Sequence, residues 1–313
     1  FGAQCIVVAV DARRVLGTVP VQKDGSAYFK IPANTPVAVQ PLDSQGRAVQ
    51  IMRSWFTGQP GEKLSCVGCH ENASQTPPSR SIAVSSRQPV EITPWRGPAR
   101  GFSFAREVQP VLDKYCAGCH DGAKPDLPDL RGGQEQTVEL KRKKKIVGFD
   151  FDGAYVDLHP YVRRPGPESD YHVPYPYEYF AETSELVQML RQGHHGVQLD
   201  AEGWDRLFTW IDLNVPDHGT WAEHRPIPND YHAKRMAMRR KYANVDVDPE
   251  AYPTPPPAPV AFVKPADVSP APVAKTDWSF TDKFESKTMT EDLGDGQKLD
   301  MVLIPGRKPF HIC

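Results

Sequence analysis

Two copies of the pentapeptide Cys-x-x-Cys-His constrain this chain more than any other feature. One copy lies in "KLSCVGCHEN" at residues 63–72, and the other lies in "KYCAGCHDG" at residues 114–122. Together they use four of the six cysteines among the 313 residues. Covalent attachment of haem c requires two thiols that meet the two vinyl groups along one porphyrin edge, followed directly by an imidazole that reaches the iron. The repeat therefore predicts two covalently bound haem c groups, each with one iron.

The predicted cofactor site includes all three functional residues of each motif. These residues are Cys66, Cys69, His70, Cys116, Cys119 and His120, and both histidines are predicted to bind iron. One alternative is a single structural zinc held by four thiolates with the spacing C-x2-C-x46-C-x2-C. Another is a pair of dithiol redox motifs. Neither alternative requires a histidine after both cysteine pairs, so the sequence favours haem.

Each iron has a second axial position that a histidine or a methionine can fill. His194 and His195, in "MLRQGHHGVQLD", lie just past the end of a predicted helix. We expect one of these two to be the distal ligand of the second haem, and the sequence does not choose between them. For the first haem the weaker candidates are His159 and His172, with His218 in "VPDHGTW" as a further one. An ordinary loop histidine is the alternative at each of these positions.

Residues 1–62 carry the patterns of short β-strands. "CIVVAV" is typical of a buried strand, and "GTVPVQKDGSAYFKI" predicts two strands joined by a turn at Asp24-Gly25. "PVAVQPLD" and "RAVQIM" predict further strands. We expect a small β-sandwich that carries the first haem over residues 1–74. A connector rich in Pro, Ser and Arg follows at 75–101.

From Phe102 onward the hydrophobic period becomes helical. The first apolar stripe consists of Val108, Val111, Leu112 and Tyr115, with Pro110 marking a kink or a late helix start. A second helix is predicted at 184–192, ended by Gly193. A third is predicted after a cap at Asp200, with its stripe at Trp204, Leu207, Phe208 and Ile211. Residues 102–225 are therefore expected to form a helical, cytochrome c-like domain with long loops.

The predicted fold class is a multidomain α+β protein, with a β-sandwich haem module followed by a mostly α cytochrome c-like module. Residues 226–275 are expected to be an extended Pro-rich linker, and 276–313 a tail that begins a truncated further domain. "KRKKK" at 141–145 is expected to be a solvated loop, with a docking patch for an acidic partner as the alternative. Cys5, in an apolar strand, is expected to be a buried free thiol. Cys313 has no assigned role.

Composition narrows the partners and the location. The chain has 37 Lys and Arg against 39 Asp and Glu, which indicates no nucleic-acid partner. No apolar run approaches the roughly 20 residues of a membrane span. Thioether attachment of haem takes place outside the cytoplasm, so we expect an exported bacterial protein, periplasmic or extracellular. The opening "FGAQCIVVAV" has no initiator methionine, and we expect a mature product or part of a larger parent polypeptide.

Several blocks resemble the hydrazine synthase alpha subunit and its multidomain cytochrome relatives. They are "GTVPVQKDGSAYFKIPANTPVAVQPLDSQGRAVQIMRSW", "FSFAREVQPVLDKYCAGCHDG", "HPYVRRPGPESDYH" and "SELVQMLRQGHHGVQLDAEGWDRLFTWIDLNVPDHGTW". The resemblance covers about residues 5–225 and implies a β-rich module with one haem and a helical module with the other. It also implies bis-histidine ligation of the second haem by His120 and a distal histidine, which favours the Gly-His-His segment.

The chain departs from that family at the first motif. In the family a tyrosine shortly after the motif replaces the motif histidine on iron, and that histidine helps to bind zinc. Here Ser74 stands four residues after His70 and no tyrosine is nearby, so ordinary ligation by His70 is expected. The ending "KLDMVLIPG" resembles the opening strand of formylglycine-generating-enzyme-like (sulfatase-modifying-factor-like) domains.

Three functions are consistent with these patterns. The favoured one is a di-haem cytochrome that transfers electrons outside the cytoplasm, with redox proteins and other subunits as partners. The alternative is a haem enzyme whose open first haem performs redox chemistry on nitrogen compounds. The third is a structural module in which haem only stabilises the fold. No catalytic residue is assigned, because the sequence has no nucleophile–base constellation, P-loop or dinucleotide fingerprint.

Overall fold

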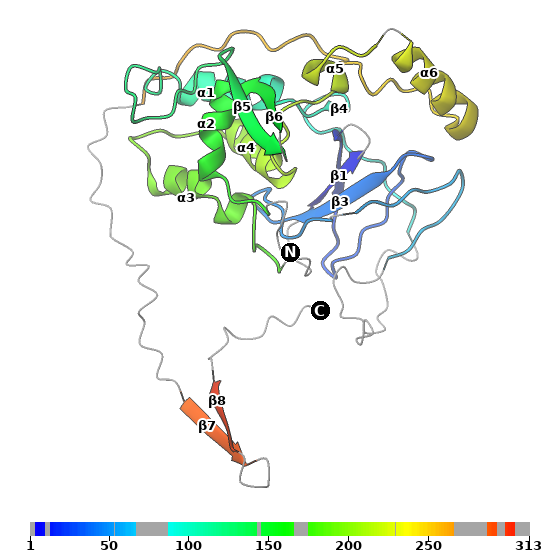
Figure 1. Ribbon diagram of the computed structural model, residues 1–313. Coiled ribbons are helices and arrows are strands. Elements are labelled where there is room, and N and C mark those ends of the chain that lie inside the picture. The colour runs from blue at the N-terminus through cyan, green and yellow to red at the C-terminus, as the bar shows by residue number, and fades with distance from the viewer. Residues whose placement is uncertain are drawn as a thin grey trace. The chain divides into compact units, whose positions relative to one another are not determined.

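The computed structural model describes most of the chain. The described residues are 4–9, 13–52, 54–66, 87–142, 145–165, 175–228, 230–265, 287–292 and 298–303. The chain divides into two compact units, Phe1–Ser269 and Pro270–Cys313. The first unit combines sheets and helices (Figure 1), which confirms the mixed α+β class, while the domain boundaries within it stay a prediction. In the second unit, β7 (Lys287–Asp292) and β8 (Lys298–Leu303) form an antiparallel pair.

A four-stranded antiparallel sheet forms the N-terminal part of the first unit. Its strands, in the spatial order β3-β1-β2-β4, are β1 (Gln4–Ala9), β2 (Arg14–Pro20), β3 (Val37–Leu42) and β4 (Arg100–Gly101). Both faces of β1 are buried. Cys5 and Val7 pack in a small separate cluster, whereas Ile6 and Val8 join the main core. This two-sided burial explains why the strand is a continuous apolar run.

The turn at Asp24-Gly25 is present, but the predicted hairpin pairing is wrong. Gly25 donates its N–H to the Gln22 carbonyl over 2.9 Å and has a φ of 83°, a conformation that glycine adopts without strain. The chain after the turn does not return to β2. Instead, the Lys30 N–H bonds the Val90 carbonyl over 2.9 Å. The partner lies sixty residues away in the sequence, so no local pattern announces it.

The predicted β-sandwich is not confirmed. The segment "RAVQIM" contributes only an isolated bridge between Leu42 and Ala48. The turn before it is as predicted, because Gly46 donates its N–H to the Asp43 carbonyl over 3.1 Å. Within the described parts of residues 1–74, no second sheet faces the first.

Part of the predicted connector belongs to the sheet. Thr93 bridges to Thr18, and Arg100–Gly101 forms β4 against β2. A Cβ on Gly101 would overlap the carbonyl group of Gly219, so only glycine allows this close approach of two backbones. The connector therefore joins the sheet to the loop around Gly219, which follows the helix at residues 201–212.

The three predicted helices are confirmed. Helix α1 (Gln109–Tyr115) follows a π-helical turn, η1 (Phe104–Val108), and places Pro110 in its first turn, where no backbone N–H is needed. Helix α3 (Glu185–Gln192) ends at Gly193, whose φ is 97°. Helix α4 (Ala201–Asp212) begins at Asp200, whose side chain accepts a hydrogen bond from the Gly203 N–H over 2.7 Å.

Several further elements were not anticipated. They are β5 (Glu135–Arg142), β6 (Lys145–Asp152), α2 (Gly153–Leu158), η2 (His159–Tyr161), η3 (Ala181–Thr183), α5 (Trp221–His224), α6 (Tyr231–Met238) and η4 (Arg239–Ala243). Strands β5 and β6 pair as a hairpin in which Arg142 lies opposite Lys145. Within "KRKKK", Lys141 and Arg142 end β5 and Lys145 begins β6, while residues 143 and 144 lie outside the described ranges. The solvated loop and the docking patch expected there stay predictions.

The helices bury the main core between η1, α1 and α4. Its most buried large side chains include Phe104, Val108, Leu112, Leu207, Trp210 and Ile211, each at 2% exposure or less. Four of these six belong to the predicted apolar stripes. The Trp210 indole donates its N–H to the Pro216 carbonyl over 3.1 Å, which satisfies its one polar atom.

A buried carboxylate ties the sheet to the helices. The Asp212 side chain accepts hydrogen bonds from the N–H groups of Ala48 (2.7 Å) and Ala181 (3.0 Å). The Gln40 amide donates to the Asp212 backbone carbonyl over 3.0 Å. Burial raises the pKa of Asp212 to about 7. The sheet residues and the helices are therefore joined through the end of α4.

A buried charge network provides a second link. Glu107 in η1 is 2% exposed and accepts hydrogen bonds from Arg100, Nε to Oε1 at 2.6 Å and Nη2 to Oε2 at 3.0 Å. Arg206 of α4 also donates to this carboxylate. The Arg100 guanidinium lies 5.3 Å from the ring centre of Trp95. The connector, η1 and α4 are thus held together by one carboxylate.

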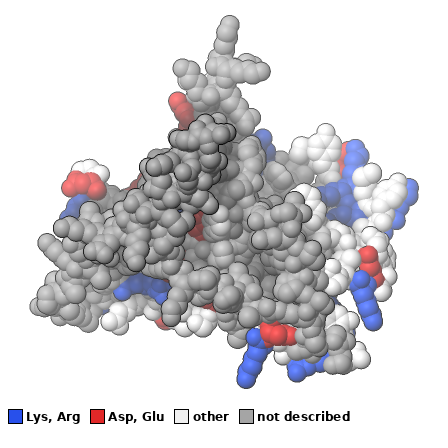
Figure 2. Space-filling view, turned by 90° about the horizontal axis from the view of Figure 1, so that it is seen from below, with Lys and Arg blue, Asp and Glu red and all other residues white. Residues whose placement is uncertain are grey.

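The surface carries side chains of both charges, in keeping with the nearly equal numbers of basic and acidic residues in the sequence. On the described part of the face shown in Figure 2, Lys and Arg are interspersed with Asp and Glu. Of the helices in the described ranges, none is long and apolar enough to cross a membrane.

Candidate functional site

The second Cys-x-x-Cys-His motif forms a tight turn at the end of α1. The Cys116 N–H bonds the Leu112 carbonyl over 2.8 Å and continues the helix. The N–H groups of Cys119 and His120 both bond the Cys116 carbonyl over 3.0 Å. The two cysteines and the histidine are therefore gathered within a single turn, as thioether attachment and axial ligation at one haem require.

The two sulfur atoms differ in their environment. Cys116 is half-buried, and burial together with the neighbouring Cys119 raises its pKa to about 12. Cys119 is exposed, and both are free thiols. Cys116 is a neutral thiol at physiological pH, and a neutral thiol and a thioether have similar polarity. The site therefore accommodates the predicted thioether without burying a charge.

The His120 ring is oriented as that of a metal-binding histidine. Its Nδ1 lies 3.2 Å from the Pro128 carbonyl oxygen. A carbonyl only accepts, so Nδ1 must carry the proton and Nε2 keeps a free lone pair. Metal-binding histidines typically donate their second ring N–H in this way. The His120 carbonyl also accepts the Leu130 N–H over 3.0 Å, which anchors the same residue from its backbone.

His194 lies opposite His120. The ring centres are 6.0 Å apart and the ring planes differ by 26°. Two imidazoles that bind one metal ion at an N–metal distance of about 2 Å place their ring centres about 6 Å apart. Burial, His195 and His120 lower the pKa of His194, in that order of importance, and favour the neutral form that binds metal. The residues present therefore fit an iron held between two axial histidines.

The two adjacent histidines differ in their surroundings. Gly193 has a φ of 97° and turns the chain at the end of α3, so that His194 contacts His120. His195 is exposed, and its ring stands edge-on to that of His194 at 4.7 Å. His194 is thus the distal candidate.

The metal chemistry of this pair is restricted. Within the described ranges, no group of three or more His, Cys, Asp or Glu side chains could hold a metal ion. Two imidazoles alone leave a tetrahedral zinc incomplete. They do complete an iron that already has four porphyrin nitrogens. The four-thiolate zinc alternative stays untested, because Cys69 lies outside the described residues.

Only part of the first motif can be placed. Cys66 is exposed and is a free thiol. Cys69, His70 and the ligand candidate His172 lie outside the described residues, as does Cys313. The predicted ligation of the first haem therefore stays a prediction.

The other two histidine candidates occupy different surroundings. His159 lies in η2, and burial lowers its pKa; its ring is 4.9 Å from that of Tyr155. His218 follows α4 and approaches His224, with 3.0 Å between Nε2 of His218 and Nδ1 of His224. Among the ring contacts of the described residues, none joins His159 or His218 to His120. Neither is therefore a ligand candidate for the second motif.

An open cavity of about 590 Å³ flanks the segment that carries His194. Its lining is Gln45, Leu190, Arg191, Val197, Gln198, Leu199, Ala201, Trp204 and Phe208. Six of the nine are apolar, and the rings of Trp204 and Phe208 are 5.2 Å apart. Leu190 and Val197 thus border this cavity on either side of His194 in the sequence.

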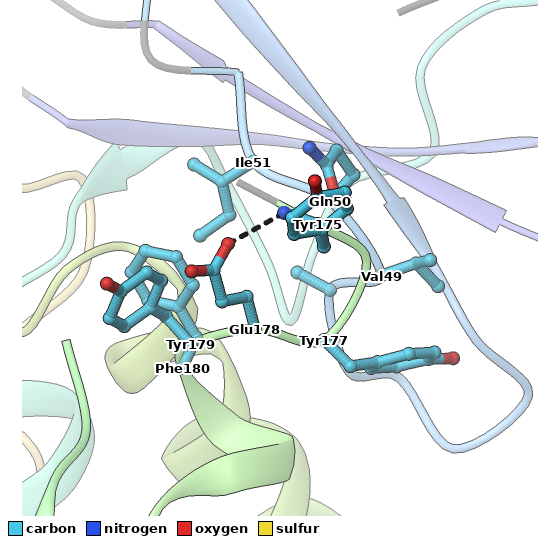
Figure 3. Close-up of a pocket in the computed structure, with 9 residues that line it drawn as sticks. Val49, Gln50, Ile51, Tyr175, Tyr177, Glu178, Tyr179 and Phe180 are labelled. Carbon is cyan, nitrogen blue, oxygen red and sulfur yellow. Dashed lines mark hydrogen bonds between the residues drawn. The ribbon is translucent and has the colours of Figure 1, made fainter. Parts of the chain in front are cut away.

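The aromatic loop at 175–180 packs against residues 48–51 of the N-terminal part (Figure 3). The space between them is only about 10 Å³, which is room for about one water molecule. The Tyr177 N–H bonds the Val49 carbonyl over 3.0 Å, and the Phe180 N–H bonds the Arg163 carbonyl over 2.8 Å. Tyr177 and Phe180 have positive φ values of 59° and 76°. This part of the loop is thus held in strained packing, and its described residues enclose no space for a porphyrin.

Two features of this site were beyond sequence reasoning. The Pro128 carbonyl that orients His120 is a backbone atom, and no residue type marks it. The contact between His120 and His194 spans 74 positions, so no periodicity reports it. The only available signal was the doubled histidine after a helix-ending glycine.

Comparison with known proteins supports the resemblance in the N-terminal part. Residues 2–71 match the hydrazine synthase alpha subunit middle domain. This matched region ends at the first Cys-x-x-Cys-His motif. Hydrazine synthase subunit alpha from Kuenenia stuttgartiensis is 24% identical over an alignment of 179 positions, and the match covers 41% of this chain and 22% of that protein. The chain thus spans less than a quarter of the length of this curated relative.

A solved structure from the same organism is also similar. It is the Kuenenia stuttgartiensis hydrazine synthase, at 19% sequence identity, covering 69% of this chain and 37% of that chain, with a TM-score of 0.39.

Proposed function

We propose that the chain is an exported bacterial di-haem c-type cytochrome whose helical part transfers electrons. In this proposal Cys116 and Cys119 attach the second haem, and His120 and His194 are its axial ligands. The 6.0 Å separation of the two imidazole rings carries the proposal, because it leaves room for one metal ion between them. Haem supplies one-electron redox chemistry when bound.

The residues around the site favour electron transfer over ligand chemistry. With haem bound, His120 and His194 would hold the iron from its two sides and would leave no open position for a substrate. The hydrogen bond from His120 Nδ1 to the Pro128 carbonyl holds the ring in the tautomer that binds metal. Burial lowers the pKa of His194 and so favours its neutral form. These groups need not move when an electron is gained or lost, and a fixed ligand set keeps the reorganisation on electron transfer small.

The proposal extends to the rest of the chain. The N-terminal part would attach the first haem through Cys66 and Cys69, with His70 on the iron. Its small sheet would form a β-rich module, and residues 102–225 a cytochrome c-like module. Thioether attachment implies a periplasmic or extracellular location. Because the similar protein is named as a subunit, we also propose that this chain works with other subunits or redox proteins.

A second candidate is a haem enzyme in which the first haem has an open position. Two observations favour it: the family match covers residues 2–71 and so reaches the first motif, and the curated relative is named hydrazine synthase. In this proposal the first haem performs redox chemistry on nitrogen compounds. The second haem would deliver or remove electrons through His120 and His194.

The experiment that tests both candidates starts with the cofactor count. The chain is produced in a host that attaches haem c, and intact-mass measurement with a pyridine haemochrome spectrum gives the number of haems. Cys66→Ala with Cys69→Ala, and Cys116→Ala with Cys119→Ala, should each remove one haem. Colourless protein, or protein with one metal ion on four sulfurs, would overturn both candidates.

The spin state then separates the candidates. Electron paramagnetic resonance of the oxidised protein should show only low-spin iron if the chain is an electron carrier. A high-spin signal that is lost with the first-motif variant, and that responds to added nitric oxide or hydroxylamine, would establish the enzyme candidate. A high-spin signal that persists in that variant would contradict the assignment of His194.

A further inference from the structure

The Pro-rich segment after α6 is attached to the helices along its length. We call residues 251–264 the strap. The Thr254 carbonyl accepts a hydrogen bond from Arg106 over 3.4 Å, and the Val263 N–H bonds the Lys114 carbonyl over 2.7 Å. Arg106 lies in η1 and Lys114 in the last turn of α1, so the strap follows this helical segment from one end to the other. In Figure 1 it crosses the top of the view, over α5 and α1.

The first anchor of the strap is Tyr252. Its hydroxyl donates to the Glu223 carboxylate over 2.9 Å, and the Arg106 guanidinium lies 3.8 Å from its ring centre. The same hydroxyl occupies the space that a Cβ on Gly219 would need. The anchor thus combines a hydrogen bond, a cation–π contact and a close approach to glycine.

The second anchor is Phe262, and it contacts the cofactor motif. Three carbons of its ring lie 2.5 to 2.6 Å from the position that a Cβ on Gly118 would occupy. Gly118 is the residue between Ala117 and Cys119 in the Cys-Ala-Gly-Cys-His turn. Any side chain at this position would displace the Phe262 ring. Phe262 is half-buried there, although the surrounding strap residues are mostly exposed.

The neighbouring backbone contact acts on the same turn. Carbonyl groups in the last turn of a helix lack partners within the helix. The Val263 N–H supplies such a partner to Lys114, two residues before Cys116. Phe262 and Val263 therefore fix the end of α1 and the turn after it from outside, at a distance of 142 positions from His120 in the sequence.

We propose that Phe262 is a positioning residue for the Cys116–His120 turn, held in place by the strap. The strap is then a clamp on the cofactor-attachment turn and not only a spacer before the second unit. The clamp restrains the two sulfur-bearing residues and the His120 backbone, and the ring occupies the space beside Gly118 that water would otherwise fill. The restraint on the turn does not require a haem. Only the expected effect on the reduction potential rests on the proposed function.

The test compares Phe262→Ala with Val260→Ala, which alters an exposed side chain of the same strap. Hydrogen exchange of the Cys119 and His120 amides is measured in the haem-free chain and in the haem-bound protein. We expect Phe262→Ala to accelerate exchange about tenfold or more, because a local opening is no longer opposed by the aromatic contact. Val260→Ala should leave the exchange unchanged. Phe262→Leu should restore most of the protection.

A second readout is the reduction potential of the second haem, measured with Cys66→Ala and Cys69→Ala in the background. Phe262→Ala should lower this potential, because water reaching the turn stabilises the more highly charged ferric state. Gly118→Ala, which displaces the ring from the other side, should shift the potential in the same direction. A merely structural role elsewhere in the fold would not move the potential.

Each result of the exchange and potential measurements either supports or overturns the proposed role of Phe262. Equal exchange and equal potential in Phe262→Ala and Val260→Ala would overturn the clamp, even if the haem is present. If the natural chain binds no haem, the proposed function fails, and exchange in the haem-free chain still decides whether Phe262 restrains the turn. Should Phe262→Ala fail to fold, the same comparison is made with Gly118→Ala, which displaces the Phe262 ring from the other side.

Discussion

Two pairs of histidines differ in how their rings are arranged. The residues of one pair precede α4 in the sequence, and those of the other pair follow it. Before the helix, the ring centres of His120 and His194 are 6.0 Å apart. After it, Nδ1 of His224 lies 3.0 Å from Nε2 of His218, which is hydrogen-bonding distance. In the first pair a metal ion has room between the rings, whereas in the second pair the rings bond each other. Proximity of two histidines is therefore not sufficient to indicate a metal site.

The partners of the outer nitrogens explain the difference. Nε2 of His224 accepts a hydrogen bond from Arg225 over 3.1 Å, so its Nδ1 must carry a proton and donate to His218. In the first pair the Pro128 carbonyl accepts a hydrogen bond from Nδ1 of His120, so Nε2 of that ring keeps its lone pair. A backbone carbonyl thus leaves Nε2 of His120 available in the first pair, whereas in the second pair an arginine directs Nδ1 of His224 toward His218.

The strongest way to break this comparison is to remove one member of each pair. His194→Ala should convert the second haem from low-spin to high-spin, because the distal position loses its ligand. His218→Ala should leave the spectrum unchanged, and so should His195→Ala. The check is electron paramagnetic resonance and visible absorption of the purified variants. A low-spin spectrum in His194→Ala together with a high-spin one in His195→Ala would reverse our choice of ligand.

The next test asks whether both pairs belong to one cooperative body. Glu107 in η1 is bound by Arg100 and by Arg206 of α4, and its side chain is 2% exposed. Glu107→Ala should lower the free energy of unfolding by about 3 to 5 kcal/mol, because Arg100 and Arg206 are left with uncompensated charge. Glu91→Ala is the control: its pair with Lys30 is largely exposed, and the cost should be at most about 1 kcal/mol.

Unfolding in urea is followed by haem absorption, which reports the first pair, and by tryptophan fluorescence. Coincident transitions that shift together in Glu107→Ala support one body. Separate transitions would show that the two pairs sit in independently stable regions, and the comparison across α4 would lose its basis.

The second pair should also respond to pH through its carboxyl neighbour. Asp217 Oδ2 lies 3.2 Å from Nε2 of His218, and burial, then Asp152 and Glu223, raise the pKa of Asp217 to about 7. The native state therefore holds a proton that the unfolded state releases near pH 4. This contribution to stability is complete below about pH 4 and is lost as the pH rises to about 7.

Because Asp217 is partly exposed, solvent screening should limit this effect to about 1 to 2 kcal/mol. The free energy of unfolding is measured between pH 4.5 and 8 in the natural chain and in Asp217→Asn. The variant should show a shallower fall over this range. In the remaining slope, Asp212, whose pKa is raised to about 7, adds a fall, and the lowered pKa values of His159 and His194 oppose it. An unchanged slope would mean that Asp217 titrates normally beside His218.

The same two pairs show what sequence reasoning reached and where it ended. The end of α3 at Gly193 and the start of α4 at Asp200 were predictable, because capping depends on neighbouring residues. The choice of His194 was not, since it depends on a contact with His120 across 74 positions. For the same reason the partner of Lys30 was missed: Val90 approaches it only in the folded chain.

The Pro-rich strap was missed for a different reason. Proline and alanine indicate an extended backbone, and the strap is extended. Whether such a segment stands free or packs is decided by single side chains, here Tyr252 and Phe262, and by glycines that leave space for them. Composition averages over these few residues and so describes the segment as a spacer.

The smallest expected effect concerns how α4 holds the first pair in place. Asp200 caps the helix through the Gly203 N–H at 2.7 Å and also pairs with Lys114 at 2.7 Å, which lowers its pKa to about 2. Asp200→Ala should cost about 1 kcal/mol, mainly through loss of the cap. Asp200→Asn keeps a capping oxygen and removes only the charge, so its melting temperature should lie close to that of the natural chain. If Asp200→Asn were as damaging as Asp200→Ala, the exposed ion pair with Lys114 would be what holds the helix start beside the first histidine pair, and the cap would be secondary.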